Sequence, residues 1–475
     1  MTPDAYRRLE VADIAELTST GLVSAGEVLD AALEVLAAEN PKFNAVVSVY
    51  ADLGRRQIEA GLPNGILSGV PVLLKDLSTA CTGTQTTFGS ALFRGATAWQ
   101  ADCALVRRLK DAGAVILGRS NCAEFGLGLW TEPDAYGPTR NPRAPQRSAG
   151  GSSGGAAAAV ASGMTPLALG TDGCGSLRVP ASHCGVFALK PSRGRISFAP
   201  EAGESWAGMT AHGALTRSVR SAALFLDAAC GPEPGDPYIA APTVTSFVNA
   251  AASPPRKLRI GVLDHGPHGA CQVDSDCAQA VHAAASMCSR HGHDVEVRHA
   301  SLDVEGLVPH LAVLWGTQLW LLVEPQYRET GRVADGSGME SSSWQLARAG
   351  RSFAADDHLG AIRYLHLAAR QFARDMHGLD VLLTPVAASP PENLGSHRND
   401  VTAEEHIRQL LLGFPFTIWA NMAGAPAMSA PLWRTREGLP VGVQAIASPG
   451  NDALLISLAA QWEASSVWQR GESGR

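Results

Sequence analysis

The sequence SAGGSSGGAAAAVASGMTPLALGTDGCGSLRVPASHCGVFALKP, residues 148–191, contains two glycine- and serine-rich clusters. The clusters, residues 150–155 and 173–176, are separated by an alanine-rich segment, 156–161, and a short apolar run, 166–170. Glycine tolerates positive φ and close backbone approach, so such clusters present main-chain N–H groups to a ligand. The alanine-rich segment predicts a helix, and the apolar run predicts a buried strand that brings the second cluster to a sheet edge. This arrangement can build an oxyanion hole beside a serine.

A serine hydroxyl is a weak nucleophile and needs an adjacent base. His183 is the only histidine close in sequence to either cluster, and His212 lies in a separate predicted loop. No G-x-S-x-G elbow surrounds Ser176, so a Ser-His-Asp triad is poorly supported. Lys75 ends the apolar run 70–74, which predicts a buried strand. Burial lowers the pKa of an amine and makes it a base, although an isolated strand-end lysine more often extends its amine to water.

Three segments of the chain match, in order, the motifs of one enzyme family. They are G-V-P-V-L-L-K-D (69–76), G-G-S-S-G-G (150–155) and G-T-D-G-C-G-S-L-R-V-P-A (170–181). This pattern resembles the amidase signature family of serine hydrolases, including the separation between Ser152 and Ser176. The similarity covers nearly the whole chain, because it continues through residues 121–125, 137–142, 189–191 and 438–444.

The resemblance implies an α/β fold in which a large, twisted, mixed sheet is covered by helices on both faces. It implies a single domain over residues 1–475, with a catalytic core at about 65–230 and a variable helical region at about 302–379. The helical region is expected to shape the substrate mouth. The strand–helix–strand order over residues 70–118 independently favours parallel strand pairs.

The resemblance also implies a catalytic triad. Ser176 would be the nucleophile, Lys75 the general base, and Ser152 the group that passes a proton between them. In the family the bridging serine follows a cis peptide bond, and the glycines before Ser152 accommodate an unusual backbone. An acyl-enzyme would form on Ser176, and water would then cleave it.

Main-chain groups of the second cluster are expected to form the oxyanion hole. Their N–H groups would come from Gly173, Cys174, Gly175 and Ser176. Cys174 departs from the family, where glycine or alanine is usual, and we expect a small buried side chain there rather than a catalytic thiol. By its place in the family motif, Gly126 is expected to offer a backbone carbonyl to the substrate.

Three further residues are expected to support the nucleophile. Asp172 and Arg178 flank Ser176 and are expected to brace the loop, either in support of catalysis or as a purely structural ion pair. Ser153 is expected to be a helix N-cap or a hydrogen-bond donor behind the site. These three supporting residues, the triad and the residues of the oxyanion hole together make up the predicted site.

Composition limits the classes of partner. The 475-residue chain is 45% hydrophobic, has a net charge of −7 and contains no basic run, which argues against nucleic acid or an anionic membrane. We find no signal-peptide pattern, no apolar run of transmembrane length and no C-x-x-C pair among the nine cysteines, so we expect a cytoplasmic protein with reduced thiols. No known metal-ligand set or phosphate-loop fingerprint is present, and we expect no cofactor. The expected partner is a small-molecule amide, and a homodimer is left open.

The expected reaction is hydrolysis of a small or medium carboxylic amide (aryl, linear or cyclic) to a carboxylate and an amine or ammonia. Residues 131–137 and 231–237 are similar to bacterial amidases of the 6-aminohexanoate-cyclic-dimer hydrolase type, but they lie outside the catalytic motifs. Three alternatives stay open: an esterase or aryl acylamidase variant, an amidotransferase A-type subunit, and a non-catalytic binding protein. Val179, where that subunit commonly has glutamine, disfavours the second, and the complete triad disfavours the third.

Periodicity also predicts individual elements. Residues 9–40 are predicted to be helical and to stop at Pro41. Residues 102–112 predict a helix capped by Asp102, and residues 193–215 predict a loop-rich segment.

Overall fold

Two fully buried strands, β2 (Pro71–Lys75) and β6 (Leu167–Asp172), lie side by side in the computed structural model. The chain is apolar through most of β2 and through the first half of β6, as expected for strands whose two faces are covered. The two strands are parallel, with Val72 opposite Leu167, so their carboxyl ends reach the same edge of the sheet. The last residues of both strands, including Lys75 and Asp172, therefore meet at one place, where ligands commonly bind in α/β folds.

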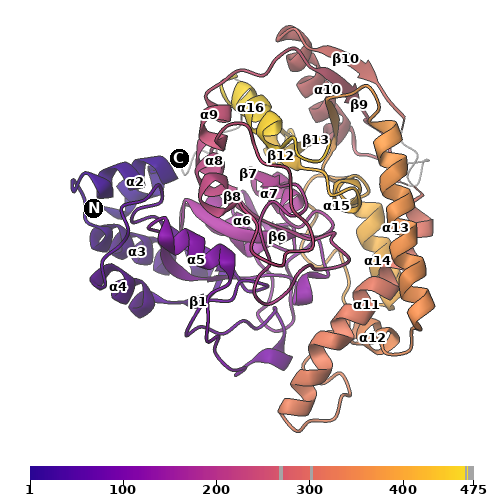
Figure 1. Ribbon diagram of the computed structural model, residues 1–475, viewed down its shortest axis with the longest axis horizontal. Helices are drawn as coiled ribbons and strands as arrows, with labels where there is room; N and C mark the ends of the chain where they lie inside the picture. The colour runs from indigo at the N-terminus through magenta and orange to yellow at the C-terminus, as the bar shows by residue number, and fades with distance from the viewer. Residues whose placement is uncertain (267–270, 300–302, 466–467, 469–475) are drawn as a thin grey trace.

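The structure describes residues 1–266, 271–299, 303–465 and 468. This part of the chain contains an 11-stranded sheet and a two-stranded sheet of β4 and β5 (Figure 1). The remaining strands are β1 (Val46–Val49), β3 (Val115–Ser120), β4 (Arg140–Asn141), β5 (Ala144–Ser148), β7 (Phe187–Lys190), β8 (Ala211–Thr216), β9 (Arg259–Val262), β10 (Asp294–Val297), β11 (Val381–Pro385), β12 (Ala427–Arg434) and β13 (Pro440–Ala447).

The strand order in the large sheet is β1-β3-β2-β6-β8-β7-β12-β13-β11-β9-β10. Strand β2 is parallel to β3 and β6, and β9 is parallel to β10 and β11. The other neighbouring pairs are antiparallel. The predicted large mixed sheet is thus confirmed.

Helices surround this sheet (Figure 1). The α-helices are α1 (Pro3–Arg8), α2 (Val11–Ser19), α3 (Ala25–Phe43), α4 (Ala51–Glu59), α5 (Ala104–Asp111), α6 (Gly154–Ala161), α7 (Arg178–Cys184), α8 (Val219–Ala229), α9 (Phe247–Ala251), α10 (Ser275–Arg290), α11 (Val304–Glu329), α12 (Ser341–Gly350), α13 (Ala355–Asp375), α14 (Ala403–Gly413), α15 (Ile418–Met422) and α16 (Asp452–Glu463). Short 3-10 helices are η1 (Ala91–Phe93) and η2 (Glu124–Gly126).

Side chains that alternate between the two faces of the sheet belong to two separate apolar clusters. On β13, Val443 and Ala445 belong to a cluster that includes residues of α10 and α16. Ile446, between two members of that cluster, belongs instead to a second cluster with residues of α11 and α14. Because successive strand residues point to opposite faces, both faces of the sheet are covered by helices.

The predicted helical region consists of α11, α12 and α13, and its first residue, Leu302, lies outside the described residues. Helix α11 packs against α12, α13 and α14. By length and composition α11 could cross a membrane, contrary to our expectation that no apolar run is that long. In the folded chain 56% of its most apolar window is buried, so its apolar character is explained by packing within the protein.

Two predicted helix boundaries are wrong. Helix α3 continues past Pro41 to Phe43 and ends at Asn44, which adopts a left-handed φ of 49°. A proline in the last turn removes only one helical N–H donor, and the helix tolerates this loss. Asp102 does not cap α5, because its carboxylate accepts hydrogen bonds from the Thr82 N–H and from Lys110, both at 2.7 Å.

The segment 193–215, predicted as loop-rich, contains most of the central strand β8. All six residues of β8 are buried, including His212 and Gly213, so the strand shows no alternation of polar and apolar residues. A short strand buried on both faces gives no period-two signal, and tertiary pairing with β6 and β7 determines it.

Candidate active site

Lys75, the last residue of β2, is fully buried. Its Nζ donates hydrogen bonds to Ser152 Oγ at 2.7 Å and to Thr171 Oγ1 at 2.9 Å. Burial lowers the pKa of Lys75 from 10.5 to about 8, although the nearby Cys122 and Asp172 oppose this change. The amine is therefore more easily neutral than an ordinary lysine, as required of a base.

Ser152 lies in the turn between β5 and α6. The peptide bond between Gly151 and Ser152 is cis. A Cβ on Gly151 would lie 2.5 Å from the backbone of Trp130, so the turn requires glycine at this position. A Cβ on Gly126 would lie 3.4 Å from Ser152 Oγ, which places the Gly126 backbone beside the Ser152 hydroxyl.

Ser176 follows β6, in the turn that leads into α7. Its carbonyl accepts a hydrogen bond from the Ser153 N–H at 3.3 Å, which joins the two glycine-rich clusters. The Ser176 and Ser152 side chains line the same cavity. The Ser176 hydroxyl forms no hydrogen bond with any described residue, so it is free to rotate toward a ligand or toward Ser152.

Asp172 and Arg178 form a fully buried ion pair behind the turn that carries Ser176. Arg178 Nη2 contacts Asp172 Oδ1 at 2.7 Å, and Arg178 Nε contacts Oδ2 at 2.9 Å. Burial alone would raise the pKa of Asp172, but the Arg178 guanidinium outweighs it and holds this pKa well below its usual range. The same carboxylate accepts hydrogen bonds from the Gly175 N–H at 2.8 Å and from the Leu177 N–H at 3.1 Å. The ion pair therefore fixes the shape of the turn.

The guanidinium of Arg178 is also held by three partners from the C-terminal part of the chain. It donates to the Thr417 carbonyl at 2.7 Å, to Gln444 Oε1 at 2.6 Å and to Asn421 Oδ1 at 2.6 Å. Sequence reasoning assigned no role to these residues. Gln444 lies within segment 438–444, whose similarity to the family could have drawn attention to it. Thr417 and Asn421 lie in no matched segment, so the sequence did not point to them.

The main-chain N–H groups of the turn differ in availability. The Gly175 N–H is already used by Asp172. Those of Gly173, Cys174 and Ser176 have no acceptor among the residues that the structure describes. The Cys174 side chain is buried, and burial raises the pKa of its thiol far above the usual value, as expected for a small apolar residue rather than a nucleophile.

Ser153 precedes the first residue of α6, but its side chain makes no capping hydrogen bond. Its hydroxyl instead donates to the Thr171 carbonyl at 3.4 Å. Of the two roles considered from sequence, the structure therefore favours the donor behind the site. Thr171 itself, which contacts Lys75, was not singled out by sequence reasoning.

Neither of the two histidines considered from sequence, His183 and His212, forms a hydrogen bond with Ser152 or Ser176. His183 and His212 are buried, and burial lowers their pKa values to about 4 and about 3. No described residue forms a hydrogen bond with either ring nitrogen of His183, and the His212 ring stacks on Phe198 at 4.1 Å between centroids. Within the described residues we find no histidine that can activate Ser152 or Ser176.

The two serines open onto a cavity of about 610 Å³. Its lining is largely apolar and aromatic, with Phe88, Phe125, Trp206 and Trp315 among the walls. Helix α11 also borders this cavity, through Trp315 and Gln318 among others. A volume of this size accommodates a drug-sized molecule.

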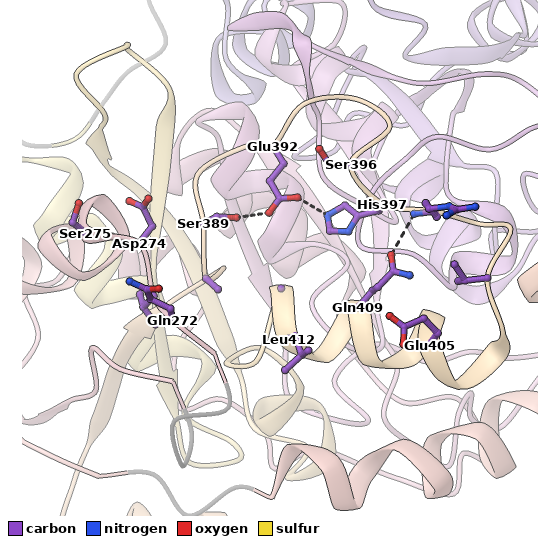
Figure 2. Close-up of a pocket in the computed structure, with 15 residues that line it drawn as sticks. Gln272, Asp274, Ser275, Ser389, Glu392, Ser396, His397, Glu405, Gln409 and Leu412 are labelled. Atoms are coloured by element: carbon purple, nitrogen blue, oxygen red, sulfur yellow. Dashed lines mark hydrogen bonds and ion pairs between the residues drawn. The ribbon is translucent and has the colours of Figure 1, made fainter.

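A larger cavity of about 1200 Å³ lies elsewhere, along the segment 388–413 (Figure 2). There Ser389 Oγ donates to Glu392 Oε1 at 2.8 Å, and His397 Nε2 pairs with Glu392 Oε2 at 3.1 Å. The carboxylate lies between the serine and the histidine, so the imidazole does not contact the hydroxyl. The hydrogen bond with His397 lowers the pKa of Glu392 to about 2, so the carboxylate that contacts Ser389 is a weak base for a serine hydroxyl.

The described residues contain no group of three or more histidine, cysteine, aspartate or glutamate side chains that could hold a metal ion. The arrangement at the carboxyl ends of β2 and β6 is thus a serine site with a buried lysine. The family model described as Amidase matches residues 27–456, so the chain belongs to the amidase signature family. It is an enzyme that hydrolyses carbon–nitrogen amide bonds.

The particular relatives are amide hydrolases of known substrate class. The chain is 35% identical to a 6-aminohexanoate-cyclic-dimer hydrolase of Paenarthrobacter ureafaciens, over 96% of this chain and 94% of that protein. The solved structure of 6-aminohexanoate cyclic dimer hydrolase with substrate has a TM-score of 0.91 and 32% identity, covering 98% of this chain and 99% of that one. A bacterial aryl acylamidase has a TM-score of 0.89 and 26% identity, covering 98% and 99%.

Proposed function

We propose that this enzyme cleaves a carboxylic amide through an acyl-enzyme on Ser176, with a Ser-Ser-Lys triad. The observation that carries the proposal is the 2.7 Å contact between buried Lys75 and Ser152, at a lysine whose pKa is lowered to about 8. The neutral amine accepts the Ser152 proton, and Ser152 accepts the proton of Ser176. The Ser176 oxygen then attacks the amide carbonyl.

The proton returns by the same path. The ammonium of Lys75 gives its proton back through Ser152 to the departing amine, because an amide leaving group must be protonated to depart. Water then attacks the acyl-enzyme, the carboxylate leaves, and the Ser176 hydroxyl is restored. No step requires a metal or a cofactor.

The oxyanion is received by the N–H groups of Gly173, Cys174 and Ser176, which have no other acceptor within the described chain. Loss of one such donor typically costs about 10²–10³ in rate. Gly175 contributes through its backbone conformation, because its N–H bonds to Asp172 and its φ of 131° suits glycine. Gly126 offers its carbonyl to the substrate from beside Ser152.

The substrate class follows from the cavity and from the relatives. Aromatic and aliphatic walls suit an uncharged amide with substantial apolar parts. The relatives that share the fold act on a cyclic dimer of 6-aminohexanoate and on aryl acylamides, by their names. We propose a cyclic amide as the first candidate and an aryl acylamide as the second.

Intact-mass spectrometry after treatment with a fluorophosphonate probe tests the nucleophile. Wild type should gain one adduct, Ser176→Ala should gain none, and Ser389→Ala, at the serine of the larger cavity, should label like wild type. Hydrolysis of 6-aminohexanoate cyclic dimer and of an anilide should be lost in parallel in Ser176→Ala. Labelling of Ser176→Ala, or failure to label folded wild type, would contradict the assignment.

A further inference from the structure

Gln318, a half-buried residue of α11, lines the cavity with its side chain held in one orientation. The main-chain N–H of Trp206 donates a hydrogen bond to Gln318 Oε1 at 2.7 Å. Because only the oxygen of a carboxamide accepts, this bond fixes which end of the amide faces Trp206. The Nε2 group is then directed away from Trp206, and it has no acceptor among the described residues. Gln318 is the one side-chain amide among the described lining residues.

Trp206 adopts an unusual backbone conformation at this contact. Its φ is 54° and that of Ala207 is 53°, a left-handed conformation that bulky residues rarely adopt. Its ring lies 4.8 Å from that of Trp315, and a Cβ on Gly173 would lie 2.6 Å from Trp206 Cε3. The Gln318 oxygen therefore helps to hold a cavity wall directly against the turn that carries the oxyanion donors.

The Nε2 end of Gln318 can donate a hydrogen bond to an acceptor on a bound ligand. Carbonyl and carboxylate oxygens both accept from an amide. Glu201 and Glu204 also line this cavity, so a carboxylate would meet charges of its own sign. An uncharged carbonyl can accept from Gln318 Nε2 and is not repelled by Glu201 and Glu204.

We infer that Gln318 is a specificity-determining residue whose Nε2 donates to a second carbonyl of the substrate, distinct from the one that Ser176 attacks. This inference rests on the proposed function and narrows its substrate class to diamides. The Gln318 oxygen holds the Trp206 wall, and the nitrogen selects molecules that carry a second amide. A monoamide of equal size fills the cavity but leaves Nε2 without an acceptor.

Turnover of a matched pair of ligands tests the selection. The pair is 6-aminohexanoate cyclic dimer, with two amides, and the saturated lactam of the same ring size, with one. Wild type should favour the diamide by about tenfold in kcat/KM, as expected for one uncharged hydrogen bond. Gln318→Glu keeps an oxygen for the Trp206 N–H but lacks the donor, so it should abolish the preference. Gln318→Met loses both contacts and should lower kcat/KM for both ligands.

Binding to Ser176→Ala, measured by isothermal titration calorimetry, separates this inference from the mechanism. Ser176→Ala should bind the diamide about tenfold more tightly than the lactam, and Ser176→Ala/Gln318→Glu should bind them equally. Equal affinity in the first protein, or a preference that survives in the second, would overturn the inference. Continued turnover by Ser176→Ala would instead overturn the proposed function, while the ratio of dissociation constants would still report on Gln318.

Discussion

At the scale of single residues, the proposed role of Lys75 predicts the pH dependence of the reaction. Its amine must be neutral to accept a proton, and burial lowers its pKa to about 8. We expect kcat/KM for an amide to rise about tenfold per pH unit below pH 8 and to level off above it. The ammonium donates to Thr171 Oγ1, and that bond favours the charged form, so Thr171→Val should move the midpoint to lower pH. If kcat/KM did not rise with pH below pH 8, the assignment of Lys75 as the base would be contradicted.

Removal of the amine should separate amides from activated esters. Lys75→Ala leaves no group to return a proton through Ser152 to the departing amine. An activated ester releases a leaving group that needs no protonation, so we expect the variant to lose far more kcat/KM on an anilide than on a nitrophenyl ester of the same acid. Thermal unfolding of the variant controls for loss of fold. Equal losses on both substrates would argue against proton return by Lys75.

The residues that we propose to perform the chemistry were easier to predict from the sequence than the residues that hold them in place. Lys75, Ser152 and Ser176 lie in local motifs, and the structure brings Lys75 and Ser152 into contact. The partners of Arg178, such as Asn421, come from more than two hundred residues away, and no local pattern reports such a contact. The hydrogen bond from the Gly175 N–H to Asp172 could not be predicted from the sequence either, because it depends on the detailed path of the turn.

At the scale of elements, two glycines in the helical region should respond oppositely to alanine. A Cβ on Gly350 of α12 would overlap the backbone of Gly316 on α11, where the two helices cross. We expect Gly350→Ala to destabilise the protein by about 1–3 kcal/mol. Gly360 is exposed within α13 and a Cβ there meets nothing within 4 Å, so Gly360→Ala should stabilise it by about 0.5–1 kcal/mol. Differential scanning calorimetry should show opposite shifts of Tm, and shifts of the same sign would refute the packing argument.

Elements with strong local signals were predicted well. Residues 24–27, Ser-Ala-Gly-Glu, fit the capping-box pattern. The box is present at the start of α3, since Ser24 Oγ accepts from the Glu27 N–H at 3.2 Å and Glu27 Oε2 accepts from the Ser24 N–H at 2.9 Å. The central strand β8 was missed, because its stability comes from β6 and β7 rather than from its own pattern. The order of the sheet could be reached only through the family resemblance, since strand pairing over long separations leaves no mark on a single sequence.

At the scale of the whole molecule, a pair of buried carboxyl groups joins η2 to the start of α12. Glu124 in η2 accepts hydrogen bonds from Ser90 Oγ at 2.6 Å and from the Glu340 N–H at 2.9 Å. Glu340 precedes α12 and accepts from the Asp134 N–H at 3.1 Å. Burial and the neighbouring Glu124 raise the pKa of Glu340 well above its usual value, and burial likewise raises the pKa of Glu124.

These raised pKa values predict a loss of stability as pH rises through the neutral range. The folded protein holds more protons on the pair than the unfolded chain does, so the free energy of unfolding falls with increasing pH. Glu340→Gln keeps an oxygen for the Asp134 N–H and carries no charge. We expect its Tm to exceed that of wild type at pH 8 by more than at pH 5, whereas Glu34→Gln, which removes an exposed carboxylate from α3, should show no such difference. If the difference in Tm between Glu340→Gln and wild type were the same at pH 5 and at pH 8, the carboxyl pair would not be the cause of a pH-dependent stability.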